Sequence, residues 1–234
     1  MVFNGDTVET RFLKEREQGV ADFHQVKAFC EEKGVEADFL TGNHDPLVTG
    51  LHHLDLAGGA VLVTHGDILF HGLSPWSREA DTLRNAHTSA LEAAGNPTLL
   101  EPCLAAARRA AISIEKLGPS PHHHARVRSL AGFVRQIWPL WRPLKMVECW
   151  LRAPSLAAAF VARYRPEAKC ILIGHTHRAG VWKIGKQVVI NTGSFLPYSG
   201  MLAVDLMPGQ LLVRKIGSER GLFRLARDVA RVEL

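Results

Sequence analysis

Histidine, aspartate and asparagine side chains recur in four short polar blocks, each directly after an apolar run. The blocks are "NGD" with Asp6, "GNHD" at residues 42–45, "THGD" with His65, and "GHTH" with His175 and His177. A single histidine after a strand is more often a structural residue than a ligand. Four such loops at one edge of a sheet can converge on a point, so together they predict a metal site.

The types of side chain in these blocks indicate which metals and which chemistry to expect. Carboxylate oxygen, amide oxygen and imidazole nitrogen without thiolate favour Mn, Fe or Zn. A carboxylate such as Asp6 can bridge two cations, and two cations about 4 Å apart can hold the attacking and leaving oxygens of a phosphoryl displacement. His44 stands beside Asn43 and before Asp45. An imidazole oriented by a neighbouring carboxylate is a general-acid candidate, which makes His44 and Asp45 the expected catalytic residues.

Taken in order, "NGD…E", "GNHD", "THGD" and "GHTH" resemble the successive blocks of the calcineurin-like metallophosphoesterases. The resemblance covers residues 1 to about 72 and 168 to about 215. It implies a metal-dependent hydrolase of phosphate esters (phosphomonoester, phosphodiester or pyrophosphate) in which a metal-bound hydroxide attacks phosphorus. It also implies divalent cations, with Mn²⁺ expected before Fe or Zn, and two of them in the family's complete site.

Carried over by position, the resemblance makes Asp6 the bridging ligand. Asn43, His65 and His175 complete the second metal position, and His177 belongs to the first. In the family's pattern His44, held by Asp45, is the acid or transition-state stabiliser.

Two departures from the family's pattern stand out. Glu9 replaces the aspartate that commonly ends the second block. The Asp-x-His block that opens the family, and supplies two ligands to the first metal, has no counterpart before Asp6. We therefore expect that the first strand is missing from the sheet and favour truncation. A natural variant with one good metal site is the alternative.

The pattern of apolar runs predicts an α/β fold: a metallophosphoesterase-type layered β-sandwich flanked by helices. We expect a single domain over residues 1–234, with an inserted helical cap at about 73–166; two independent domains are the alternative. Residues 11–33 predict a helix, and "IGKQ" predicts a hairpin turn. Within the cap, we expect the helices to be broken at "GPSPHHH" and by Pro139, Pro143 and Pro154.

Composition is that of an ordinary soluble protein, with 47% hydrophobic and 22% charged residues. The net charge of +5 suits an anionic ligand, but it does not indicate a nucleic acid partner. The four cysteines are far apart in the sequence, which predicts reduced thiols. The sequence shows neither a signal peptide nor an apolar run of membrane-spanning length, so we expect a cytoplasmic protein acting on a phosphorylated small-molecule or lipid-linked substrate.

Weaker signals leave alternatives open. Arg178 and His71 are candidates for substrate binding, against a plain surface arginine and an exposed loop histidine. The basic, aromatic stretch 126–165 is interpreted first as a packing face of the cap and second as a peripheral membrane contact. We interpret His122–His124 as a solvated turn. The alternative functions are a UDP-diacylglucosamine pyrophosphohydrolase-like enzyme acting on a lipid or nucleotide-sugar, and an inactive scaffold or binding protein with a degenerate metal site.

Overall fold

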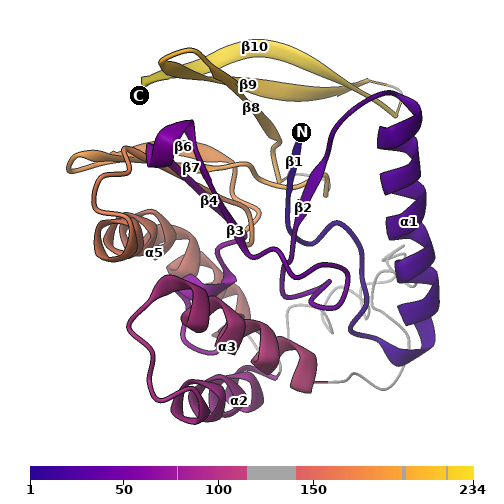
Figure 1. Ribbon diagram of the computed structural model, residues 1–234, viewed down its shortest axis with the longest axis vertical. Helices are drawn as coiled ribbons and strands as arrows, with labels where there is room; N and C mark the ends of the chain where they lie inside the picture. Colours follow the sequence, from indigo (N-terminus) through magenta and orange to yellow (C-terminus); the bar gives the residue numbers. More distant parts are fainter. Residues whose placement is uncertain (78, 115–140, 197–198, 220) are drawn as a thin grey trace. The chain divides into compact units, whose positions relative to one another are not determined.

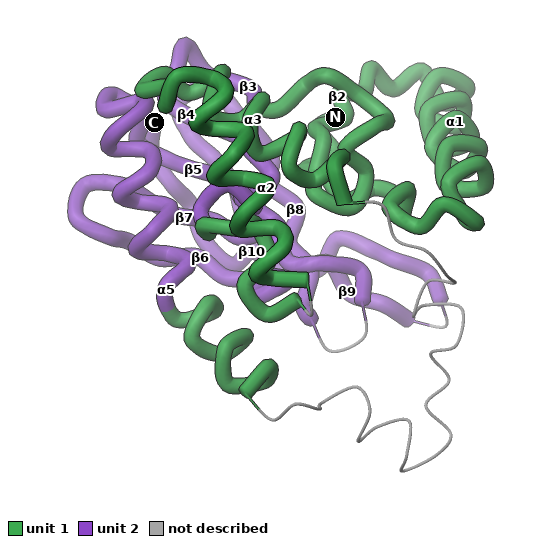
Figure 2. Tube along the Cα trace, turned by 90° about the horizontal axis from the view of Figure 1, so that it is seen from below, with its two compact units in different colours: residues 1–52, 70–151 green, residues 53–69, 152–234 purple. Residues whose placement is uncertain are grey.

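A computed structural model describes residues 1–77, 79–114, 141–196, 199–219 and 221–234. The described residues form a mixed α/β structure with four α-helices and three β-sheets (Figure 1). They divide into two compact units (Figure 2). Unit 1 comprises Met1–His52 and Phe70–Leu151, and unit 2 comprises His53–Leu69 and Arg152–Leu234. The single domain with a helical cap remains a prediction, and cap residues 115–140, including His122–His124, lie outside the described residues.

Unit 1 begins with a β-α-β arrangement. Strand β1 (Val2–Asn4) pairs in parallel with β2 (Asp38–Leu40), and the connection contains a 3₁₀ turn (Leu13–Glu15) and α1 (Arg16–Glu32). A helix within residues 11–33 is therefore confirmed.

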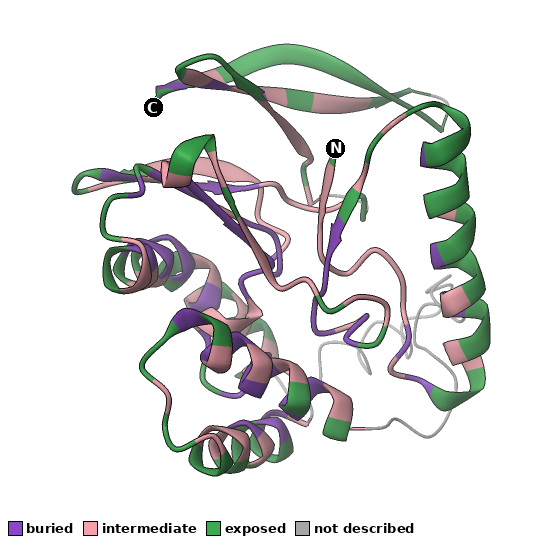
Figure 3. Cartoon of the chain, viewed as in Figure 1, coloured by how far each residue is buried: buried purple, intermediate pink, exposed green. Residues whose placement is uncertain are grey.

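Aromatic side chains form the core of this part of unit 1. The Phe39 ring stacks on Phe3 with 4.5 Å between ring centroids, and it meets Phe23 of α1 edge to face at 5.0 Å. The opposite face of α1 is exposed (Figure 3), which matches its polar residues. This packing fixes where β1 and β2 end, and the polar loops that follow them carry two of the four blocks.

The second part of unit 1 is helical. Helix α2 (Ala80–Ala93) packs against α3 (Leu100–Ser113), whose buried face is rich in alanine. Alanine favours a helix and allows close approach of two backbones. Helix α2 ends where Gly95 and Asn96 take positive φ angles of 72° and 50°.

Helix α5 (Trp141–Tyr164) corrects one expectation about the prolines. The helix includes Pro143 and Pro154, both of which we expected to break it. Pro143 lies in the first turn, where the backbone N–H has no partner within the helix, so proline is tolerated there. Pro154 lies in the interior. Ala153, Ala157 and Val161 around and after it recur on one buried face, and this packing supports the helix across the proline.

Helix α2 buries His87, which is 3% exposed and has no hydrogen-bond partner for either ring nitrogen among the described residues. Burial, assisted by the nearby charge of His71, lowers the pKa of His87 to about 4 from 6.5. The unfolded chain therefore takes up a proton near pH 6.5, whereas the folded chain does so only near pH 4. The stability contributed by neutral His87 is complete above pH 6.5 and is lost as the pH falls through 4.

We expect His87→Leu to remove this pH dependence. Between pH 7 and pH 4.5 the free energy of unfolding of the original chain should fall by about 2 to 3 kcal/mol more than that of the variant. Urea unfolding at the two pH values measures the difference, with the exposed His24 of α1 replaced by leucine as the control. Equal losses in the original chain and in His87→Leu would contradict the prediction.

Unit 2 contains a five-stranded sheet in the order β3-β4-β5-β7-β6. Its strands are β3 (His53–Leu56), β4 (Val61–Thr64), β5 (Cys170–Ile173), β6 (Gly180–Ile184) and β7 (Gln187–Asn191). The three inner strands run parallel, and the two outer strands are antiparallel to their neighbours. Inner strands of this kind are buried on both faces, which explains the unbroken apolar runs "VLV" and "CILI". The hairpin expected at "IGKQ" is confirmed as the turn between β6 and β7.

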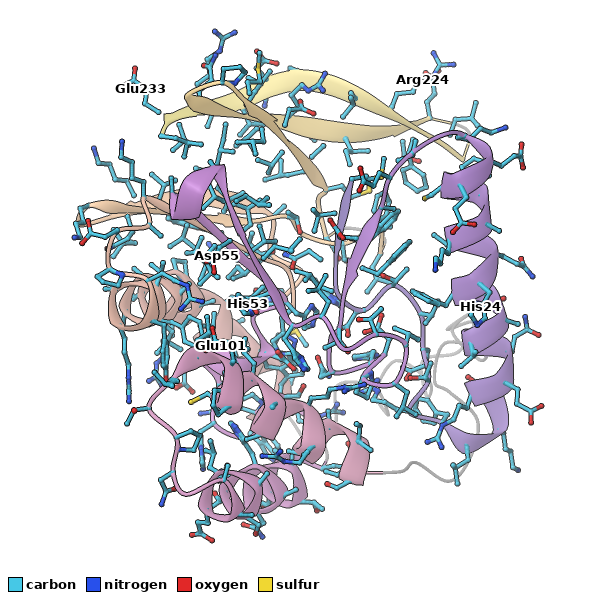
Figure 4. The ribbon with its side chains drawn as sticks, viewed as in Figure 1. His24, His53, Asp55, Glu101, Arg224 and Glu233 are labelled. Carbon is cyan, nitrogen blue, oxygen red and sulfur yellow. The ribbon has the colours of Figure 1, made fainter. Side chains whose placement is uncertain are left out.

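Short connections and one ion-pair network complete this part of unit 2. A 3₁₀ turn (Ala57–Gly59) joins β3 to β4, and a second (Asp67–Leu69) follows β4. The Arg165 guanidinium donates to Asp55 on β3 at 3.0 Å and lies 3.3 Å from the Nε2 atom of His53. Figure 4 labels both β3 residues. The network ties the chain just after α5 to the outer strand of the sheet.

The third sheet, also in unit 2, is antiparallel with the order β10-β9-β8. It consists of β8 (Leu202–Met207), β9 (Gln210–Glu219) and β10 (Leu222–Glu233). All four cysteines of the chain are free and buried, as expected for reduced thiols. None of the helices in the described part of the chain has the length and hydropathy of a membrane-spanning segment.

Candidate metal and phosphoester site

The loop after β1 carries Asp6 in an unusual backbone conformation. Gly5 and Asp6 have φ angles of 77° and 52°, so two successive residues lie in the left-handed region. A non-glycine residue seldom adopts this conformation unless its surroundings impose it. Here the His44 backbone N–H donates to Asp6 Oδ1 at 2.8 Å, which fixes the direction of the carboxylate.

Gly42 explains how the two loops of unit 1 approach so closely. A Cβ atom at this position would overlap the Asp6 carboxylate and lie 2.6 Å from the Asp6 backbone nitrogen. Any side chain at position 42 would therefore push Asp6 away. The glycine of "GNHD" is required by the contact between this block and "NGD".

Asp45 joins the same two loops by hydrogen bonds to the backbone. It is completely buried, and its carboxylate accepts from the N–H groups of Asp6 at 3.1 Å, Thr7 at 2.7 Å and Gly42 at 2.7 Å. Charged acceptors make strong hydrogen bonds, and in a buried position these hold both loops rigid. The carboxylate of Asp45 therefore stabilises the loops that carry Asp6 and His44.

The carboxylate found against the His44 imidazole is Glu9, where we expected Asp45. His44 Nδ1 lies 2.8 Å from Glu9 Oε2. Arg11 Nη2 lies 2.8 Å from the same Glu9 oxygen and 2.6 Å from His44 Nδ1. Nδ1 carries a proton when it donates to Glu9 and none when it accepts from Arg11, so the tautomer decides which of the two partners it bonds.

Electrostatics keep Glu9 ionised. Burial by itself would raise its pKa, but the hydrogen bonds and charges of His44 and Arg11 hold the pKa at about 2 instead of 4.5. A permanent carboxylate beside an imidazole fixes the orientation of the ring. The Glu9–His44 pair is therefore suited to proton donation.

Asn43 is also buried in unit 1. It is 4% exposed, and its Nδ2 atom donates to Ser74 Oγ at 3.4 Å. An amide that donates through nitrogen can turn its oxygen toward a cation, which is the role expected of Asn43 as a ligand.

Unit 2 brings His65 and His175 together. They follow β4 and β5, neighbouring parallel strands of the central sheet, and the Gly174 N–H donates to the His65 carbonyl at 2.9 Å. His65 Nε2 lies 3.2 Å from His175 Nδ1, and the rings meet edge to face with 5.1 Å between centroids. Both side chains are buried. Two imidazole nitrogens at this separation fit ligands of one borderline divalent cation.

The remaining candidate residues are His177, Arg178 and His71. His177 is half-buried with a φ angle of 58°, and the Arg178 guanidinium lies 5.7 Å from the centre of the Trp182 ring. His71 is exposed, as the simpler interpretation expected, and its Nε2 atom lies 3.3 Å from Thr88 Oγ1. Substrate binding by Arg178 and His71 stays a prediction.

Within each unit, side chains of the kinds that hold divalent cations are in place: Asp6 in unit 1, and the neighbouring His65 and His175 in unit 2. All three were expected as ligands. Two residues of the site were missed: Glu9, which was noted only as a departure from the family's pattern, and Arg11. The sequence did contain a signal for Glu9, because a carboxylate only three residues after Asp6 can lie in the same loop.

Comparison with known proteins gives little beyond this geometry. No protein-family model and no curated protein matches the chain. Among solved structures, a double mutant of Vps29 from Entamoeba histolytica matches with a TM-score of 0.25 and 16% identity, over 34% of this chain and 46% of that chain. A single mutant of the same protein matches with a TM-score of 0.24 and 15% identity over the same shares. The chain thus spans about half the length of the structures it matches.

Proposed function

We propose that the protein is a metal-dependent hydrolase of phosphate esters. The observation that carries the proposal is in unit 1, where the Glu9–His44 pair stands on the same loops as the carboxylate of Asp6. A carboxylate ligand next to an oriented imidazole is the combination that phosphoester cleavage needs: one group to hold a cation and one to deliver a proton. The order of the four sequence blocks supports the same assignment.

The proposed ligands, taken from the order of the four sequence blocks, are Asp6 and Asn43 together with His65, His175 and His177. Oxygen and nitrogen donors without thiolate suit Mn²⁺, with Fe or Zn as alternatives. When bound, such a cation supplies Lewis acidity toward a phosphoryl oxygen and activates water as a nucleophile. The protein's own contribution is to keep these donors in place before the substrate arrives.

His44 would protonate the leaving-group oxygen through Nε2. Its Nδ1 atom lies 2.8 Å from Oε2 of Glu9, which stays ionised because its pKa is about 2. Arg11 holds the other side of the Glu9 carboxylate through Nε at 3.1 Å, so Glu9 cannot rotate away from the imidazole. Arg11 and Arg178 are cationic and could each orient the anionic substrate, with Arg178 following the histidines of "GHTH".

Hydrolysis of bis(p-nitrophenyl) phosphate tests the proposal. We expect the chain to release p-nitrophenolate when Mn²⁺ is added, to stop when EDTA removes the metal, and to recover when Mn²⁺ is restored. His24→Ala is the matched control, because His24 lies on α1 with its side chain exposed (Figure 4), and it should keep full activity. A folded sample with no metal-stimulated turnover would overturn the proposed activity of this chain.

A further inference from the structure

Asn191 is the last residue of β7, at the carboxyl end of the central sheet of unit 2. Its backbone is paired with Ile173, the last residue of the neighbouring strand β5. The "GHTH" loop begins directly after Ile173. Asn191 is 1% exposed, so its polar side chain is buried beside the loop that carries His175 and His177.

The amide of Asn191 connects two loops. Nδ2 donates to Thr176 Oγ1 at 2.8 Å, and Oδ1 accepts from the Gly193 backbone N–H at 2.9 Å. Thr176 is 5% exposed and lies between the two histidines. A single buried side chain thereby ties the loop after β5 to the chain after β7.

The backbone of the "GHTH" loop requires such support. His175 and His177 have φ angles of 22° and 58°, a left-handed conformation that non-glycine residues adopt only under constraint. Thr176 is the residue between them. Its side-chain hydrogen bond to Asn191 is therefore placed to hold both unusual conformations at once.

We propose that Asn191 is a positioning residue for His175 and His177, acting through Thr176. The hydrogen bond from Asn191 Nδ2 to Thr176 Oγ1 keeps the loop in the left-handed conformation and so keeps both imidazoles where a cation meets them. The role of the histidines as ligands rests on the proposed function. The effect of Asn191 on the loop itself does not, since it follows from the hydrogen bonds.

The test separates positioning from ordinary stability. Thr176→Val keeps the shape of the side chain but removes the hydroxyl, and Thr176→Ser keeps the hydroxyl. Thr192→Val is the matched control, because Thr192 Oγ1 also donates at the end of the sheet, but to the Ile173 carbonyl at 3.3 Å. Each variant is measured for its thermal midpoint, for Mn²⁺ affinity by calorimetry, and for amide hydrogen exchange at His175–His177 in metal-free protein.

We expect Thr176→Val to weaken Mn²⁺ binding about tenfold and to speed exchange in the loop, as for other residues that orient metal ligands. Thr176→Ser should have the Mn²⁺ affinity and the loop exchange rate of the original chain. Thr192→Val should leave both unchanged even where it lowers the thermal midpoint. In a double variant, Asn191→Ala with Thr176→Val should bind Mn²⁺ no more weakly than Asn191→Ala alone, because the two residues act through one bond.

Equal exchange rates in Thr176→Val and Thr176→Ser would overturn the inference, as would equal Mn²⁺ affinities. Additive losses in the double variant would also overturn it. If the original chain binds no Mn²⁺, the proposed function fails, and the exchange rates in metal-free protein still decide the role of Asn191.

Discussion

Replacing His44 by alanine is expected to lower Mn²⁺-dependent turnover by about 10²- to 10⁴-fold, the usual contribution of a general acid. Mn²⁺ affinity should stay close to that of the original chain, because the His44 imidazole is not among the proposed ligands. The loss should appear in kcat and not in KM, because the proton is delivered in the transition state and not when the substrate binds. Steady-state kinetics with bis(p-nitrophenyl) phosphate and calorimetric titration with Mn²⁺ measure the two quantities.

His24→Ala serves as the control for this prediction, and Glu9→Gln serves as a graded variant. Glutamine keeps the size of Glu9 and part of its contact with the His44 imidazole but removes the carboxylate charge, so kcat should fall by less than in His44→Ala. A fall in Mn²⁺ affinity that matches the fall in turnover would show that His44 acts on the metal and not on the leaving group. Unchanged turnover would remove His44 from the mechanism.

Replacing Asp45 by alanine is expected to destabilise the fold by about 3 to 5 kcal/mol. The substitution removes the one acceptor shared by the N–H groups of Asp6, Thr7 and Gly42. It leaves the buried Gly42 N–H and the partly buried Asp6 and Thr7 N–H groups without this partner, and it creates a cavity between two loops. Urea unfolding measures the free energy, and Mn²⁺ titration of the folded fraction should show weakened binding because Asp6 is no longer held.

Asp38→Ala is the matched control, since Asp38 is an exposed aspartate on β2 of the same unit and should change the stability by less than about 0.5 kcal/mol. The free energy of unfolding lost in Asp45→Asn should lie between the losses in Asp45→Ala and Asp38→Ala, because the amide keeps one oxygen as an acceptor. A loss in Asp45→Ala as small as in Asp38→Ala would contradict the role given to Asp45.

The elements that carry the site were readable from the sequence because their burial leaves a periodic or continuous apolar pattern. The runs "VLV" and "CILI" indicated buried strands, and the polar residues after them were correctly expected to meet, as His65 and His175 do. The side-chain partners within the loops could not be predicted from the sequence. Whether Glu9 or Asp45 reaches His44 depends on the left-handed turn at Asp6, which no sequence period encodes.

Two further features depended on tertiary context. Pro154 was expected to end a helix, but the buried face of α5 stabilises the helix through it. His87 looked like any residue of a polar helix, and only the packing of α2 shows that it is buried without a partner among the described residues. In both cases packing overrides the local preference of the residue.

The central claim is that the imidazoles of His65 and His175, which lie 3.2 Å apart in unit 2, hold the same cation. Calorimetric titration with Mn²⁺ of the original chain, His65→Ala and His175→Ala tests it most directly. We predict that the original chain binds Mn²⁺ and that each single substitution weakens the same site by at least about tenfold. Binding of Mn²⁺ to either variant with the affinity and stoichiometry of the original chain would contradict the claim.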